Sequence, residues 1–101
     1  MARILKHDAE RLLGNVPAEY VFQCRDGNTF RNLRELTEAL TTMTEETFVF
    51  HANEEKNDFS NWVGDVIRDE KLARDLRKAL NQTQAAKKVM QRITFLEGKL
   101  A

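Results

Sequence analysis

The chain has 101 residues, of which 42% are apolar and 32% charged, and its 16 basic and 16 acidic side chains leave no net charge at pH 7. This composition is typical of one folded domain that buries a single core, and it excludes a disordered chain. We expect a soluble cytoplasmic protein, because no window suits a membrane span or a signal peptide and the one cysteine, Cys24, cannot form an internal disulfide.

The first predicted element is a short amphipathic helix over residues 3–13, where apolar side chains recur near helical spacing and Gly14 follows as a C-terminal cap. After Pro17, the alternation of Tyr20, Phe22 and Cys24 with their neighbours predicts a half-buried strand. An Asp-Gly-Asn turn at residues 26–28 and a short return strand over residues 29–31 complete a predicted hairpin.

The middle of the chain predicts a helix and then another strand. Asn32 followed by Glu35 indicates a helix start, and leucines at helical spacing extend this helix to near Thr42. The apolar run at residues 48–50 is short and rich in β-forming residues, so it predicts a buried strand that ends at His51. A strand, a helix and a strand in this order would form a right-handed crossover.

The second half of the chain predicts three helices. Asn57 or Asp58 caps the first, which runs to Ile67, and Asp69 and Asn81 cap the next two. In the last helix, over residues 82–101, the apolar side chains step by three and four. They form a heptad-like seam of Ala86, Val89, Ile93, Leu96 and Leu100, which Met90 and Phe95 widen. The predicted interaction surface consists of Val89, Met90, Ile93, Leu96 and Leu100. We expect this seam to pack on the first helix or on a second copy of the chain.

These elements predict a single α+β domain over residues 1–101. A small sheet of two or three strands packs against helices in a core region over residues 18–80. The flanking regions, residues 1–15 and 82–101, are N- and C-terminal amphipathic helices. The aromatic residues expected to anchor the core are Phe48, Phe50, Phe59 and Trp62.

The charges are segregated along the sequence. Residues 19–64 contain nine acidic and four basic residues, about −5, and residues 65–101 contain five acidic and nine basic residues, about +4. A basic helical end on an acidic body can steer a partner or pair with another copy. Ordinary solvated helix faces would give the same pattern, and that interpretation is favoured.

Several short motifs follow one another between residues 18 and 80. They are Tyr20-Val21-Phe22, the turn at Gly27, the helix over residues 33–40, Phe48-Val49-Phe50-His51, Asn57-Asp58-Phe59-Ser60-Asn61-Trp62 and Leu72-Ala73. In this combination the chain resembles an uncharacterised domain family of archaea and bacteria, with a Phe-x-His strand followed by an Asp-Phe-x-x-Trp helix. The resemblance implies a recurring prokaryotic module and a fold, and it carries over no activity. The first and last helices lie outside it.

A group of polar side chains lies where the predicted strand at residues 48–50 meets the next helix. His51, Glu54 and Asp58, with Glu55 beside them, include donors that a metal ion or a proton transfer can use. A structural role is favoured, because Asp58 can cap a helix and His51 can hydrogen-bond that cap. Cys24 is interpreted as a small core residue because it lies on the apolar side of its strand.

The sequence contains no phosphate-binding loop, nucleophile elbow or zinc-protease motif, so we expect neither an enzyme nor a cofactor. The leading hypothesis is a protein-protein interaction or assembly module that acts through the C-terminal seam, with a protein partner or with itself. The alternative is a small-ligand or metal-binding domain centred on His51 and Asp58. Nucleic-acid binding by the basic C-terminal helices is a weaker alternative, because the pI of about 6.7 lacks a positive excess.

Overall fold

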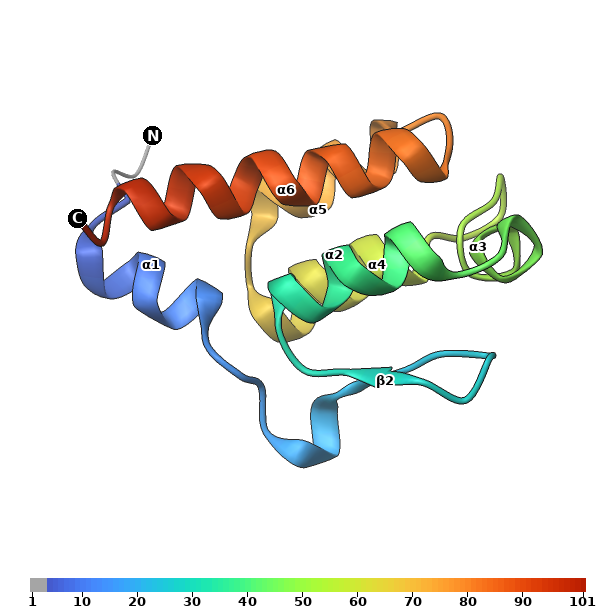
Figure 1. Ribbon diagram of the computed structural model, residues 1–101, viewed down its shortest axis with the longest axis horizontal. Coiled ribbons are helices and arrows are strands. Elements are labelled where there is room, and N and C mark those ends of the chain that lie inside the picture. The colour runs from blue at the N-terminus through green and yellow to red at the C-terminus, as the bar shows by residue number, and fades with distance from the viewer. Residues whose placement is uncertain (1–3) are drawn as a thin grey trace.

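The computed structural model describes residues 4–101 and is a small α+β fold, 65% helical and 6% strand (Figure 1). The predicted fold class is confirmed. The helices within these residues are α1 (Lys6–Leu13), α2 (Leu33–Thr42), α3 (Glu45–His51), α4 (Asp58–Trp62), α5 (Glu70–Lys78) and α6 (Gln82–Gly98). The other elements are the 3₁₀ turn η1 (Ala18–Tyr20), the π-helical turn η2 (Val63–Ile67) and the strands β1 (Phe22–Gln23) and β2 (Thr29–Phe30). Part of the first predicted helix, at Arg3, lies outside the described residues.

Most of the helices begin at a side-chain cap. In each of five helices, the side chain before the first helical residue accepts a hydrogen bond from a backbone N–H three residues further on. The capping residues are Asn32, Thr44, Asn57, Asp69 and Asn81. Four of these caps were predicted from the sequence, and Asn57 rather than Asp58 is the cap of α4.

The predicted strand at residues 48–50 is wrong, because this run belongs to helix α3. Thr44 caps the helix, and Glu45 and Glu46 in the first turn interact favourably with the helix dipole. Phe48 is buried, whereas Phe50 is 42% exposed and its ring lies under the side chains of Arg25 and Lys56. The described residues therefore hold neither a third strand nor a crossover, and Phe50 is not a core residue.

The predicted hairpin is confirmed, although its first strand is shorter than expected. Tyr20 lies in η1 and is exposed, and the pairing is limited to Phe22 with Phe30 and Gln23 with Thr29. The turn closes through a hydrogen bond from the Cys24 N–H to the Asn28 carbonyl, and Gly27 has a φ of +93°, which favours glycine.

The hairpin covers an aromatic cluster that forms one half of the core. The ring of Phe22 stacks on Phe30 and on Phe59, with centroid distances of 4.6 and 5.2 Å. The ring of Trp62 lies edge-on to Phe22 and Phe30, and its indole N–H donates to the Tyr20 carbonyl at 2.8 Å. The structural roles predicted for Phe48, Phe59 and Trp62 agree with their burial.

The other half of the core lies under α6, which runs along one side of the molecule (Figure 1). Its apolar seam packs on α2, α5 and α1 of the same chain, so that Val89, Ile93 and Leu96 are buried. Contact with the first helix was predicted, and the larger contact with α2 was not. Asp69 and Arg92 connect α5 to α6 through a buried two-pronged ion pair with N–O distances of 2.7 and 3.0 Å.

None of the helices in residues 4–101 is long and apolar enough to cross a membrane.

Candidate functional site

His51 closes α3 and is only 4% exposed, with both ring nitrogens in hydrogen bonds. Its Nε2 accepts the backbone N–H of Arg25 at 3.0 Å, and its Nδ1 lies 2.9 Å from Oδ2 of Asp58. Because a backbone N–H can only donate, Nε2 must be the unprotonated nitrogen. Nδ1 therefore carries the proton and donates it to the Asp58 carboxylate.

The same contacts fix the charge of Asp58. Burial raises the pKa of the Asp58 carboxyl, but the hydrogen bonds from His51 and Lys56 outweigh this effect and leave the pKa below its ordinary value. An ionised carboxylate and a neutral imidazole thus hold the hairpin, α3 and α4 together.

This arrangement leaves no free nitrogen on His51 for a metal ion or for proton transfer. Glu54 lies in the exposed loop, and the Lys56 ammonium group pairs with the Asp58 carboxylate at 3.0 Å. Within residues 4–101, no group of three or more His, Cys, Asp or Glu side chains is placed to hold a metal ion. The geometry therefore favours a structural role for His51 and Asp58, whereas Glu54 lies outside their contacts.

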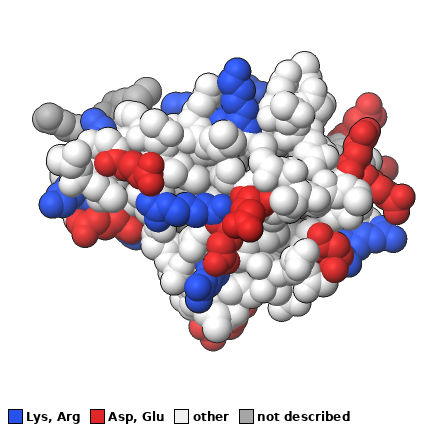
Figure 2. Space-filling model, viewed as in Figure 1, with Lys and Arg blue, Asp and Glu red and all other residues white. Residues whose placement is uncertain are grey.

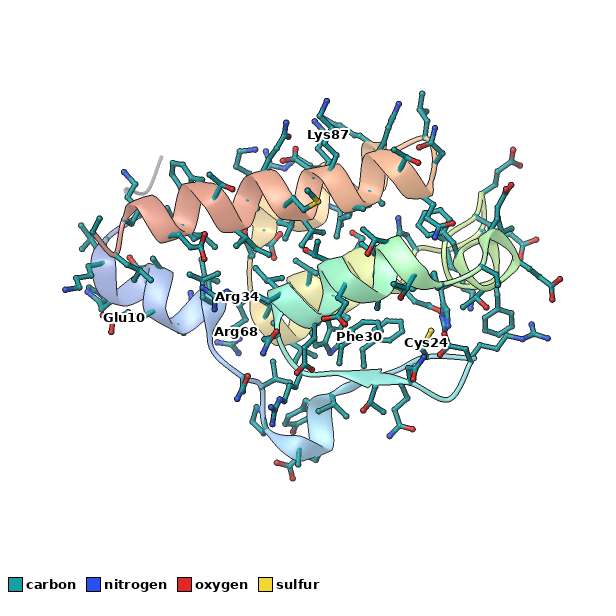
Figure 3. All side chains as sticks on the ribbon, in the orientation of Figure 1. Glu10, Cys24, Phe30, Arg34, Arg68 and Lys87 are labelled. Carbon is teal, nitrogen blue, oxygen red and sulfur yellow. The ribbon has the colours of Figure 1, made fainter. Side chains whose placement is uncertain are left out.

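Cys24 is buried beneath the hairpin (Figure 3). Burial raises the pKa of its thiol, so the sulfur is protonated at neutral pH. A protonated, buried thiol is a poor nucleophile, which agrees with its interpretation as a core residue.

The basic residues of the last two helices are partly neutralised by neighbouring acids. Lys71 pairs with Asp75 at 2.7 Å, and Arg92 is buried against Asp69. Other cations, such as Arg74 and Lys88, are exposed, and the exposed ring of Phe95 is already covered by the side chains of Arg92 and Lys99. This distribution does not favour nucleic-acid binding.

A different surface, formed by α2 and α6, has the features of a binding site. The two helices lie side by side on the broad face of the molecule and run antiparallel (Figure 1). At one end Arg34 pairs with Glu97 at 2.9 Å, and at the other end the Gln82 amide donates to the carbonyls of Leu40 and Met43. These contacts fix the register of α2 against α6.

A shallow groove of about 340 Å³ lies between the two helices. It is lined by Leu40, Thr41, Gln82, Thr83, Ala86, Lys87 and Met90. Met90 is 50% exposed at the groove although it is a large apolar side chain. Flexible, polarisable methionine side chains are common at surfaces that bind other proteins.

The surface around the groove carries little charge. We call it the α2–α6 face and define it by Thr37, Thr41, Thr83, Ala86, Met90 and Thr94. The hydroxyls of Thr37, Thr41 and Thr94 already donate to carbonyls of their own helices. Because these hydroxyls are already hydrogen-bonded within the chain, dehydrating them is less costly than dehydrating free hydroxyls. In the space-filling view, uncharged atoms form a continuous area across the upper centre of this side (Figure 2).

Two charged residues border the α2–α6 face. Lys87 extends from the outer edge of α6 (Figure 3), and Glu38 lies on the opposite edge, where α2 faces β2. Within the described residues neither forms an ion pair, whereas Arg34 and Glu97 neutralise each other. An uncharged centre with charged residues at its rim is the usual anatomy of a protein interface.

The structure keeps only part of the predicted interaction surface exposed. Three of its five residues, Val89, Ile93 and Leu96, are buried in the chain's own core. Leu100 is partly buried, and Met90 is exposed. The α2 side of the face was missed. The sequence does carry a signal for it, since threonines at positions 37 and 41 lie one helical turn apart on the polar side of an otherwise leucine-rich helix.

Comparison of the chain with protein-family models, with curated proteins and with solved structures finds no match. The resemblance to an uncharacterised domain family therefore stays an interpretation of the sequence.

Proposed function

We propose that this chain is a non-enzymatic protein-interaction module that binds a helix of another polypeptide on the α2–α6 face. The observation that carries the proposal is the half-exposed Met90 at an apolar groove between two antiparallel helices. Covering Met90 and the apolar wall of the groove with a partner would remove apolar surface from water, which favours binding.

The shape of the groove favours a helix as the occupant. Side chains of a third helix can interdigitate with the ridges of two neighbouring helices, as they do in helix bundles. The ten residues of α2 extend over roughly 15 Å, which corresponds to nearly three helical turns of an occupant. The Arg34–Glu97 ion pair borders one end of the surface, and the other end opens at Thr83.

The main alternative is a ligand or metal site at His51 and Asp58, which the contacts of these residues do not favour. Both nitrogens of His51 are engaged within the chain, so a ligand would have to break the hydrogen bond to Arg25 or to Asp58. Breaking either bond would leave a buried polar group unpaired.

The proposal is tested with the purified chain immobilised on a resin and an extract of its source cells. Wild type is compared with Met90→Lys, which charges the groove, and with Phe95→Lys, which charges a similarly exposed site about 140° away around α6. We expect one protein to be retained by wild type and by Phe95→Lys, and its retention by Met90→Lys to fall at least about tenfold.

A second measurement locates the bound protein on the chain. The sequence has three methionines, so ¹³C labelling of their methyl groups gives three signals, of which Met90 reports on the groove and Met43 on the core. The retained protein, once purified, should shift the Met90 signal more than the Met43 signal. Equal retention by wild type and Met90→Lys, with no change at Met90, would refute the proposed function.

A further inference from the structure

We propose that the polypeptide bound on the α2–α6 face is a second copy of this chain, paired about a two-fold axis so that Lys87 of each copy meets Glu38 of the other. This inference rests on the proposed function and names its partner. The placement of the two charges, the helix register and the net charge of the molecule support it.

The two charges lie on opposite edges of the same uncharged face. Lys87 borders the groove on α6, and Glu38 borders the hollow on the far side of α2. Both side chains are exposed, and neither has an ion-pair partner among residues 4–101. A surface with one positive and one negative edge is complementary to itself after a half-turn.

The helix register places the two charges at nearly the same level along the helices. Arg34 lies opposite Glu97, and Leu40 lies opposite Gln82. Position 38 on α2 therefore falls opposite positions 87–90 on α6, because the two helices run antiparallel with the same rise per residue. Lys87 and Glu38 thus differ mainly in the edge that they occupy.

A two-fold axis parallel to the helices, between two facing copies, preserves this level and exchanges the edges. It lays α6 of one copy over α2 of the other, so that the contact between Lys87 and Glu38 forms twice. Exposed uncharged side chains, including Met90 and Thr41, come together between these two contacts. A closed dimer of this kind buries the same patch on both subunits.

The size and charge of the molecule are compatible with this pairing. A specific interface of about 800 Å² per partner would cover about an eighth of the 6627 Å² surface, and the helices lie on the broad side of a body of 37 × 28 × 21 Å. Because the chain has no net charge at pH 7, two copies meet without long-range repulsion.

The test is a charge exchange between two single variants, Glu38→Lys and Lys87→Glu. Each variant alone brings like charges together at both contacts, so its dimer dissociation constant should rise about tenfold or more. In an equimolar mixture of the two variants both contacts become complementary again. At one contact the introduced lysine of the first variant meets the introduced glutamate of the second, and at the other the native Lys87 meets the native Glu38.

Sedimentation of the full chain should then detect a heterodimer about as stable as the wild-type dimer. Melting curves verify that each variant is folded, since both positions are exposed.

The outcomes separate this inference from the proposed function. A wild-type chain that stays monomeric at every concentration overturns the second copy as partner, as does a dimer that both substitutions leave unchanged or that mixing does not restore. If, in those cases, Met90→Lys still abolishes retention of a different protein from the extract, the α2–α6 face binds that protein and the proposed function stands. If retention is also unaffected, both fail.

Discussion

At the scale of single residues, His51 is a buried polar group whose two ring nitrogens are both hydrogen-bonded. It lies among Phe22, Phe50 and Phe59, accepts from the Arg25 backbone and donates to Asp58. The hairpin, α3 and α4 are therefore held together by one imidazole, in the tautomer that is protonated at Nδ1. The sequence places His51 near Asp58 through the short spacing between them, but the contact with Arg25 comes from the hairpin and has no sequence signal.

Replacing His51 should destabilise the whole domain. His51→Ala removes two hydrogen bonds and a buried ring, and it leaves the Arg25 N–H without an acceptor. We expect a loss of roughly 2–4 kcal/mol in the free energy of unfolding, measured by urea denaturation. His7→Ala is the control, because the His7 side chain is 76% exposed, and it should change stability by less than about 0.5 kcal/mol. An equally small effect at His51 would contradict its structural role.

The lowered pKa of Asp58 predicts a pH dependence with a definite sign. Because the pKa is lower in the folded state than in the unfolded chain, where it is about 3.9, the stabilisation is fully present above that pH. It is lost as the pH falls through the folded-state value. The difference in unfolding free energy between wild type and Asp58→Asn should therefore be constant near neutral pH and shrink below about pH 4. Asp26 and Asp75, whose pKa values are also lowered, are present in both proteins and cancel in this comparison. A difference that grows on acidification would refute this assignment.

At the scale of elements, the sequence predicted the features that depend on contacts between residues close together in the chain. The caps at Asn32, Asp69 and Asn81 act within three residues, so the sequence contains the whole interaction. The run at residues 48–50 was assigned wrongly because three apolar residues fit a strand as well as one turn of a helix. The deciding features, the Thr44 cap and the cover that Arg25 and Lys56 give to Phe50, lie outside the run.

The cap at Thr44 offers a test of this explanation. Thr44→Ala removes the acceptor of the Thr47 N–H and should cost about 1 kcal/mol of stability, with α3 fraying first. Thr44→Ser keeps the oxygen and should restore most of the loss. Hydrogen exchange of the α3 amides distinguishes local fraying from global unfolding. Unchanged exchange in Thr44→Ala would mean that tertiary contacts alone hold the helix.

The C-terminal seam shows a second limit of sequence patterns. The heptad-like spacing of the apolar residues predicts that Val89, Ile93 and Leu96 are buried. It does not predict which surface covers them. Here the partner surface is α2, α5 and α1 of the same chain. The exposed side of α6, with Met90, forms a groove only together with α2, so the sequence of α6 alone could not predict that groove.

At the scale of the whole molecule, the segregation of charge noted in the sequence has no single spatial counterpart. Ion pairs between neighbouring residues, such as Lys71 with Asp75, neutralise some of these charges. What remains on the α2–α6 face is an uncharged centre with one positive and one negative edge. Two helices form this face, and 39 residues separate the end of α2 at Thr42 from the start of α6 at Gln82. No local sequence pattern could therefore define it.

The central claim is that the α2–α6 face joins two copies of this chain, and the most direct test is the mass in solution across a dilution series. Wild type and Met90→Lys are compared by light scattering, with Phe95→Lys as the control. We predict twice the 11.7 kDa mass of one chain for wild type and the control at high concentration, decreasing on dilution, and a single-chain mass throughout for Met90→Lys. Identical masses for all three proteins at every concentration would contradict self-association through this face.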